Sequence, residues 1–124
     1  MLLENCMKSN EIEKLINKLR EFSRERDWEQ FHSPKNLVMA LSSETGELIE
    51  HFQWLSESES YLEDNDETLT SVKEELADVF LYLLQISDKL GIDILDCATK
   101  KIDLNARKYP VSLSKGKAEK YNKL

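Results

Sequence analysis

Apolar residues recur every three or four positions along most of the chain, which is the spacing of one face of an α-helix. The first such stripe predicts a helix over residues 11–27, with Asn10 as its N-cap. Ser33 followed by Pro34 marks the start of a second helix over residues 34–55. A capping hydroxyl and a proline at the first helical position both favour a helix start there.

The acidic segment 56–70 has little periodicity and predicts a solvated linker. A third helix is expected from residue 68 or 70 to residue 90, because Gly91 is a stop signal. Asp93 then caps a fourth helix that lasts to about Lys108. The pattern therefore alternates helices with short connectors and contains no hairpin signal.

These elements predict an all-α fold, a compact four-helix bundle. The apolar positions of the third helix cover more than one face, so this helix should lie at the centre of the bundle or in a subunit interface. We expect residues 1–124 to form a single domain, with a core over about 11–110 and a basic tail over 111–124.

Composition narrows the class of protein. The chain has 124 residues, 40% of them hydrophobic and 33% charged, as in a globular domain, and its net charge is −7. That charge argues against binding a nucleic acid polymer, which usually requires a basic patch. The apolar run at 79–84 is too short to span a membrane, and Cys6 and Cys97 show no disulfide or zinc spacing. We therefore expect a cytoplasmic protein.

Acidic residues interrupt the apolar stripes of two of the helices. Glu44 and Glu47 lie three apart on the second helix, and Glu75 and Asp78 lie three apart on the third. If these helices run antiparallel, the two pairs face each other at similar height. The alternative is that the acids lie on solvated flanks and pair with lysines.

Facing carboxylates would require a counter-ion. Two like charges about 4 Å apart repel by roughly 4 kcal/mol at an effective dielectric constant near 20, and several such pairs rival the 5–15 kcal/mol stability of a small domain. Oxygen ligands alone suit Mg²⁺, with Mn²⁺ as a substitute. A di-iron centre would need Glu-x-x-His on two helices, and only Glu29 to His32 fits that motif.

A Mg²⁺ site favours phosphoanhydride hydrolysis as the chemistry. Tyr82 follows Asp78 by one helical turn. Lys101 and Asn105 lie four apart on the fourth helix, where both could contact phosphate oxygens. The alternative for Lys101 is a surface lysine that extends into solvent. Trp28 and Trp54 flank the second helix and would either pack in the core or stack on a nucleobase. The nearby His32 would either cap a helix or pack.

Two motifs then reveal a resemblance. SSETGELIEHFQW followed by EELADVFLYLL resembles the E-x-x-E…E-x-x-D signature of the MazG-like all-α nucleoside triphosphate pyrophosphohydrolases. The stretches ERDWEQFHSPKNL and KKIDLNARKYP are most similar to the dCTP pyrophosphatase branch of that superfamily. The resemblance covers roughly residues 12 to 121.

The resemblance implies that the chain hydrolyses dCTP or a related deoxynucleoside triphosphate to the monophosphate and pyrophosphate, and that it forms a homodimer or homotetramer. It implies Mg²⁺ held by Glu44, Glu47, Glu75 and Asp78. It also implies that the base and sugar pocket is lined by Trp28, His32 and Trp54. The residues that would help to hold the nucleotide are Tyr82, Lys101 and Asn105.

Three points stay open. Glu47 is the first candidate for the general base and Glu50, one turn on, is the second. Eukaryotic members carry a histidine on the first helix where this chain has Leu19 and Arg20, so the preferred base is undetermined. The alternative function is a non-catalytic helical module that binds nucleotide or a partner protein and keeps a structural divalent ion.

Overall fold

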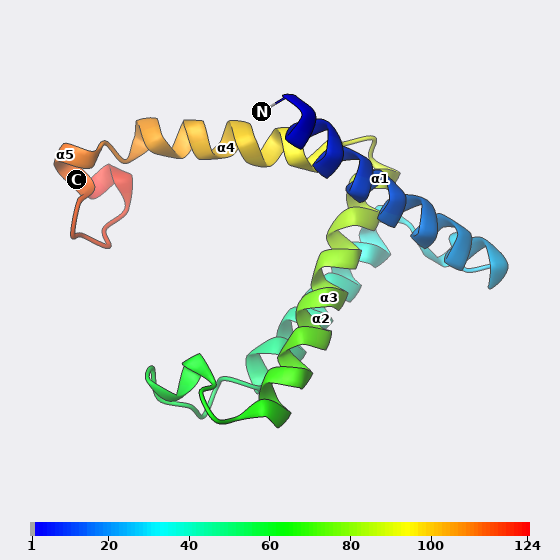
Figure 1. The fold of residues 1–124 in the computed structure, drawn as a ribbon, viewed down its shortest axis with the longest axis horizontal. Coiled ribbons are helices and arrows are strands. Elements are labelled where there is room, and N and C mark those ends of the chain that lie inside the picture. The colour runs from blue at the N-terminus through cyan, green and yellow to red at the C-terminus, as the bar shows by residue number, and fades with distance from the viewer. Residues whose placement is uncertain (1) are drawn as a thin grey trace. The chain divides into compact units, whose positions relative to one another are not determined.

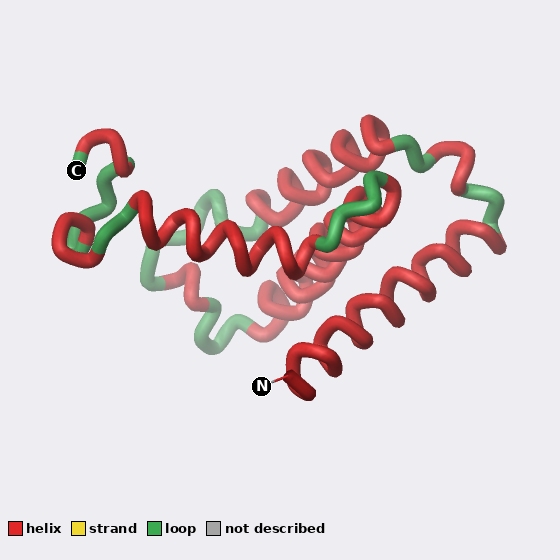
Figure 2. Tube along the Cα trace, turned by 90° about the horizontal axis from the view of Figure 1, so that it is seen from above, coloured by secondary structure: helices red, strands yellow, loops and turns green. Residues whose placement is uncertain are grey.

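A computed structural model describes residues 2–124, with side chains from Asn10 onward, and over this range the regular secondary structure is helical throughout (Figures 1 and 2). The all-α prediction is confirmed. The chain divides into two compact units, one ending at Gly91 and the other covering Ile92–Leu124. The elements in chain order are α1 (Leu2–Glu25), η1 (Glu29–Phe31), α2 (Pro34–Glu50), η2 (Glu59–Tyr61), α3 (Asp66–Lys89), α4 (Ile94–Lys108), α5 (Val111–Ser114) and η3 (Tyr121–Lys123).

Helices α2 and α3 run antiparallel and side by side, and they form the framework of the first unit (Figures 1 and 2). Leu37 of α2 and Leu84 of α3 are almost completely buried, and Leu62 and Val72 are nearly so. Helix α1 also contacts α3, which therefore packs against both of the other long helices of this unit. The predicted central position of α3 holds within this unit.

Local capping signals placed several helix ends correctly. Ser33 Oγ accepts a hydrogen bond from the Asn36 backbone N–H at 3.2 Å, and Pro34 opens α2 as predicted. The Asp93 carboxylate likewise accepts from the backbone N–H of Asp96 at 3.1 Å and caps α4. Gly91 follows the end of α3 with φ +65°, a left-handed conformation that glycine adopts without steric cost.

Other helix ends were predicted wrongly. Helix α1 begins at Leu2, because neither glycine nor proline separates residues 2–9 from the amphipathic stripe, so Asn10 lies inside the helix rather than capping it. Helix α2 ends at Glu50, and residues 51–54 form turns. These turns contain hydrogen bonds between residues three apart, such as that from the Phe52 N–H to the Ile49 carbonyl at 2.9 Å. Helix α3 begins at Asp66, earlier than predicted.

The second unit contains α4, α5 and η3. Within the basic tail, Tyr121 packs edge-on against Tyr109 with ring centroids 6.1 Å apart. Lys108 lies over the Tyr121 ring at 5.0 Å from its centroid, which adds a cation–π contact. The tail therefore folds back within this unit. The arrangement of all four long helices as one bundle and one domain stays a prediction.

No helix within residues 2–124 combines the length and the apolar character that crossing a bilayer requires.

Candidate functional site

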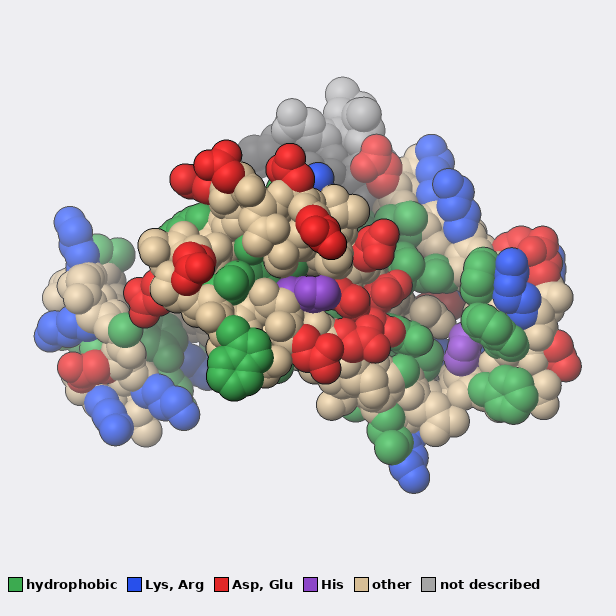
Figure 3. Space-filling view, turned by 90° about the horizontal axis from the view of Figure 1, so that it is seen from below, with side chains coloured by type: hydrophobic (Ala, Val, Ile, Leu, Met, Phe, Trp, Pro, Cys, Tyr) green, Lys and Arg blue, Asp and Glu red, His purple; other side chains and the backbone are tan. Residues whose placement is uncertain are grey.

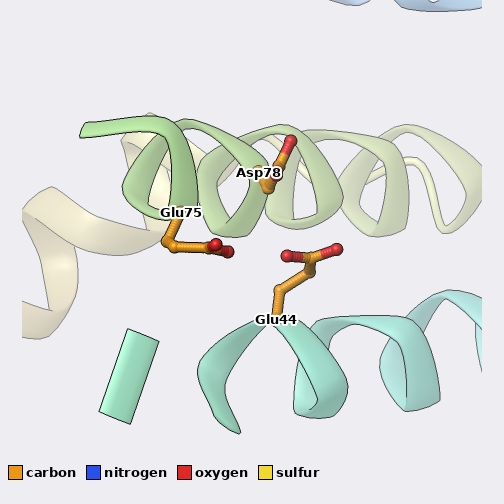
Figure 4. A group of neighbouring side chains, drawn as sticks. All are labelled: Glu44, Glu75 and Asp78. Atoms are coloured by element: carbon orange, nitrogen blue, oxygen red, sulfur yellow. The ribbon is translucent and has the colours of Figure 1, made fainter. Parts of the chain in front are cut away.

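Three carboxylates lie close together where α2 and α3 face each other: Glu44 and Glu75 point toward one another, and the exposed Asp78 carboxyl lies beside them on α3 (Figure 4). Glu44 comes from α2, and Glu75 and Asp78 come from successive turns of α3. Each offers one oxygen, and these oxygens all lie within 4.8 Å of one another (Figure 4). Figure 3 shows acidic side chains gathered on one face of the molecule. The antiparallel pairing thus brings together three of the four acids that the sequence singled out as metal ligands.

The centre of this acidic group holds two buried oxygens that no protein group satisfies. Glu44 Oε2 and Glu75 Oε2 are both buried without a hydrogen-bond partner among the described residues. An unpaired buried carboxylate oxygen is costly, and a hard divalent cation with oxygen ligands removes that cost. The donor set therefore fits Mg²⁺ or Mn²⁺.

Crowding changes the acidity of the innermost carboxyl. Burial, then a hydrogen bond and the negative charge of Glu47, and further the charge of Asp78, raise the pKa of Glu44 to about 7. At neutral pH Glu44 is therefore divided between its protonated and ionised forms. The raised pKa is the expected response of a carboxyl that shares a small space with other acids.

The fourth predicted ligand, Glu47, lies at the edge of the group. It is exposed on α2 and is close enough to Glu44 to raise that pKa, but it is not one of the three residues whose oxygens meet within 4.8 Å. Its roles as ligand and as general base stay predictions. Glu50, the second candidate base, is exposed at the end of α2.

A histidine that sequence reasoning missed lies beside the acidic group. His51 Nε2 is 3.7 Å from Glu75 Oε1, and both side chains are largely buried. The distance suits an ion pair when the imidazole is protonated. His51 follows Glu47 by four residues, and this helical spacing was the feature of the sequence that could have predicted a histidine beside the acids.

A pocket of about 390 Å³ opens beside the acidic group, lined by residues of α1 and α3 and by Trp28 and His32 on either side of η1. Its apolar wall is formed by Leu15, Leu19, Phe22, Trp28 and Leu81. Trp28 is 44% exposed and packs edge-on against Phe22 with ring centroids 5.7 Å apart. The volume and the aromatic wall suit a flat, partly apolar ligand.

Polar side chains in the same pocket connect it to the acidic group. Asp78 belongs to both, and Tyr82 lies one turn further along α3. Burial, followed by the negative charges of Glu44, Asp78 and Glu47, raises the pKa of Tyr82, so its hydroxyl stays protonated and can donate a hydrogen bond. Two predicted nucleotide contacts, Trp28 and Tyr82, thus line one pocket.

His32 also lines this pocket and contacts two other residues of its wall. Its Nδ1 lies 3.4 Å from the hydroxyl of Ser23, a buried residue of α1, and its ring packs edge-on against Trp28 at 6.3 Å between centroids. Ser23 was missed in the sequence, as were Lys18 and Gln85 in the same wall. All three interrupt apolar helical faces, and this was the only feature of the sequence that could have predicted their place in the pocket wall.

The remaining predicted contacts lie elsewhere. Trp54 is 87% exposed in the turn after α2 and is not among the residues lining the pocket. Lys101 and Asn105 are exposed on α4, in the second unit. Their roles stay predictions.

Known proteins similar to this chain include curated enzymes and a solved structure. Proteins named dCTP pyrophosphatase 1 from Rattus norvegicus and Homo sapiens are 44% and 40% identical over 105 residues. The match covers 84% of this chain and 62% of each relative. A crystal structure described as a pyrophosphatase from Archaeoglobus fulgidus is 40% identical with a TM-score of 0.75, covering 81% of this chain and 93% of that one.

The model of the MazG-like family matches residues 39–124, which include most of α2, the whole of α3 and all three converging carboxylates. Together with the similarity to the dCTP pyrophosphatase 1 proteins, this match shows that the chain belongs to the MazG-like family.

Proposed function

We propose that the chain is a Mg²⁺-dependent pyrophosphohydrolase that converts dCTP or a related deoxynucleoside triphosphate to the monophosphate and pyrophosphate. The observation that carries this proposal is the convergence of Glu44, Glu75 and Asp78 beside a nucleotide-sized pocket that shares Asp78. The names of the rat, human and archaeal relatives support the same reaction class.

The three converging carboxylates would hold Mg²⁺, or Mn²⁺ in its place. A divalent ion in such a site neutralises phosphate charge and activates water for attack on a phosphoanhydride. The protein's part is to place fixed acids at one end of the pocket, so that the triphosphate of a bound nucleotide lies beside them. His51, whose Nε2 lies 3.7 Å from Glu75 Oε1, would help to orient that carboxylate.

A base is needed to take the proton from the water that attacks the α-phosphorus. Glu47 is our first choice because it lies at the edge of the acidic group, exposed and adjacent to Glu44. Glu50 is the second choice, one turn further along α2. A carboxylate at the solvent edge can pass the proton on to water.

The pocket would bind the nucleoside part. Trp28 offers a face for stacking, and His32, held against it and close to Ser23, completes that wall. Tyr82, protonated, donates toward the sugar or phosphate. Trp54, Lys101 and Asn105 are proposed as further contacts to the nucleotide.

Substrate hydrolysis tests this proposal directly. We expect pyrophosphate and a nucleoside monophosphate to be released from at least one member of a panel of deoxynucleoside triphosphates with Mg²⁺, and no release in the presence of chelator. Binding of a nucleotide without any Mg²⁺-dependent turnover would instead identify a non-catalytic module with a structural ion.

We further propose that the chain forms a homodimer or homotetramer. Leu76, Phe80 and Leu83 lie on one face of α3 and are 51%, 40% and 36% exposed, although α3 is the central helix of its unit. Exposed apolar stripes of this kind are typical of subunit interfaces.

Phe80→Glu is expected to dissociate the oligomer, because it places a charge at a surface that would be desolvated on association. Sedimentation velocity measures the change in mass. Thr70→Glu adds the same charge at an exposed position of α3 outside the stripe and should leave the mass unchanged. A monomeric wild type, or an intact oligomer in Phe80→Glu, would contradict the interface.

A further inference from the structure

Gln85 lines the pocket two helical turns along α3 from Asp78, the residue that the pocket shares with the acidic group. It is half-buried on α3, and it lines both the 390 Å³ pocket and a small adjacent cavity of about 30 Å³. Two polar residues that line these spaces with it are already engaged, since Ser23 lies 3.4 Å from His32 and Asp88 pairs with Arg20. Among the described residues, none forms a hydrogen bond with the Gln85 amide. Gln85 therefore brings an uncommitted donor and acceptor to the pocket wall.

The spacing along α3 relates Gln85 to the phosphate end of the pocket. Asp78, Leu81, Tyr82 and Gln85 follow the i, i+3, i+4, i+7 pattern and line the pocket from one helical face. Seven residues of α-helix rise by about 10.5 Å. A nucleotide has a length of that order from its α-phosphate to the edge of its base. With phosphates beside Asp78 and the base against Trp28, the polar edge of the base comes within reach of Gln85.

We propose that Gln85 hydrogen-bonds the polar edge of the nucleobase and so helps to set the base preference of the enzyme. This inference rests on the proposed function and names a specificity residue within that site. A carboxamide donates and accepts at once, which matches bases that present a donor beside an acceptor. Losing such a contact leaves buried polar groups of the base unpaired, so discrimination falls more than overall catalysis.

Gln85→Leu keeps the approximate size of the side chain and removes both hydrogen-bonding groups. We expect KM for the preferred deoxynucleotide to rise about tenfold with kcat changed less than about twofold, since one net hydrogen bond is worth about a factor of ten. The ratios of kcat/KM among the four deoxynucleoside triphosphates should become more equal. Gln85→Glu, which only accepts while ionised, should shift these ratios in a base-dependent direction.

Two controls separate base reading from a structural role. An abasic deoxyribose triphosphate should be hydrolysed equally by wild type and Gln85→Leu, because it offers no base edge. Gln53→Leu makes the same change at an exposed glutamine in the turn after α2 and should alter no ratio. Unchanged ratios in Gln85→Leu, or an equal loss on the abasic substrate, would overturn the inference.

Binding measurements keep this test separate from that of catalysis. Calorimetric titration with the four deoxynucleoside monophosphates reports base preference without turnover. If wild type binds them but hydrolyses no triphosphate, the proposed reaction fails, while an altered affinity order in Gln85→Leu still supports base reading. If wild type binds none of them, the inference about Gln85 fails as well.

Discussion

Glu75→Gln is expected to lower the kcat/KM of Mg²⁺-dependent pyrophosphate release by about 10²- to 10³-fold, since metal-assisted charge stabilisation is worth several kcal/mol. Glu75 supplies one of the three converging oxygens and carries one of the two buried oxygens without a partner. Glutamine has nearly the same shape but lacks the charge, so the loss measures electrostatics rather than packing. Steady-state kinetics with saturating Mg²⁺ measures it.

The thermal stability of the metal-free protein should increase in Glu75→Gln, although its activity falls. Without metal, Glu75 carries a buried carboxylate oxygen that has no partner among the described residues, so replacing the carboxylate with a neutral amide should raise the thermal midpoint of the chelated protein. Glu74→Gln makes the same change at an exposed neighbour on α3 and should affect neither quantity. A Glu75→Gln variant with near wild-type turnover would show that this acid is not part of the catalytic metal site.

Mg²⁺ binding is expected to weaken roughly 25-fold between pH 7.5 and pH 5.5, because protons compete with the metal for a carboxyl whose pKa is raised to about 7. An ordinary glutamate, ionised throughout this range, would give almost no change. Calorimetric titration with Mg²⁺ at several pH values measures the effect. An affinity that is flat over this range would show that Glu44 does not bind the ion in competition with a proton.

The same carboxyl should make the metal-free protein more stable in mild acid. Its folded-state pKa of about 7 exceeds the ordinary value of 4.5, so between these values the folded chain binds more protons than the unfolded chain. The resulting stability is fully present below pH 4.5 and is lost as the pH rises through 7. Urea unfolding with chelator at pH 5 and pH 8 measures the difference, which should shrink in Glu44→Gln.

Sequence patterns were sufficient to predict the antiparallel pairing of α2 and α3 and the meeting of three of the four acids. Ser33 with Pro34 set the start of α2, Gly91 ended α3, and the apolar stripes fixed which faces meet. Glu44 and Glu75 interrupt those stripes, so burying the stripes also buries the acids. This part of the site follows from local signals and periodicity alone.

The pocket wall could not be predicted in the same way. Ser23 and His32 meet because the connector after α1 turns back, and Gln85 faces the pocket because α1 packs on α3. The start of α1 was missed because ordinary helix-forming residues precede Asn10 without any break. Such contacts depend on crossing geometry between helices, which a single sequence does not encode in its periodicity.

The metal site itself can be located by anomalous diffraction from crystals of the protein soaked in Mn²⁺, collected above the manganese absorption edge. We expect a strong anomalous peak in the space enclosed by Glu44, Glu75 and Asp78, within about 2.5 Å of an oxygen from each. No peak between these three carboxylates at full Mn²⁺ loading, or ordered manganese only at other acidic residues, would contradict the assignment of this cluster as the divalent cation site.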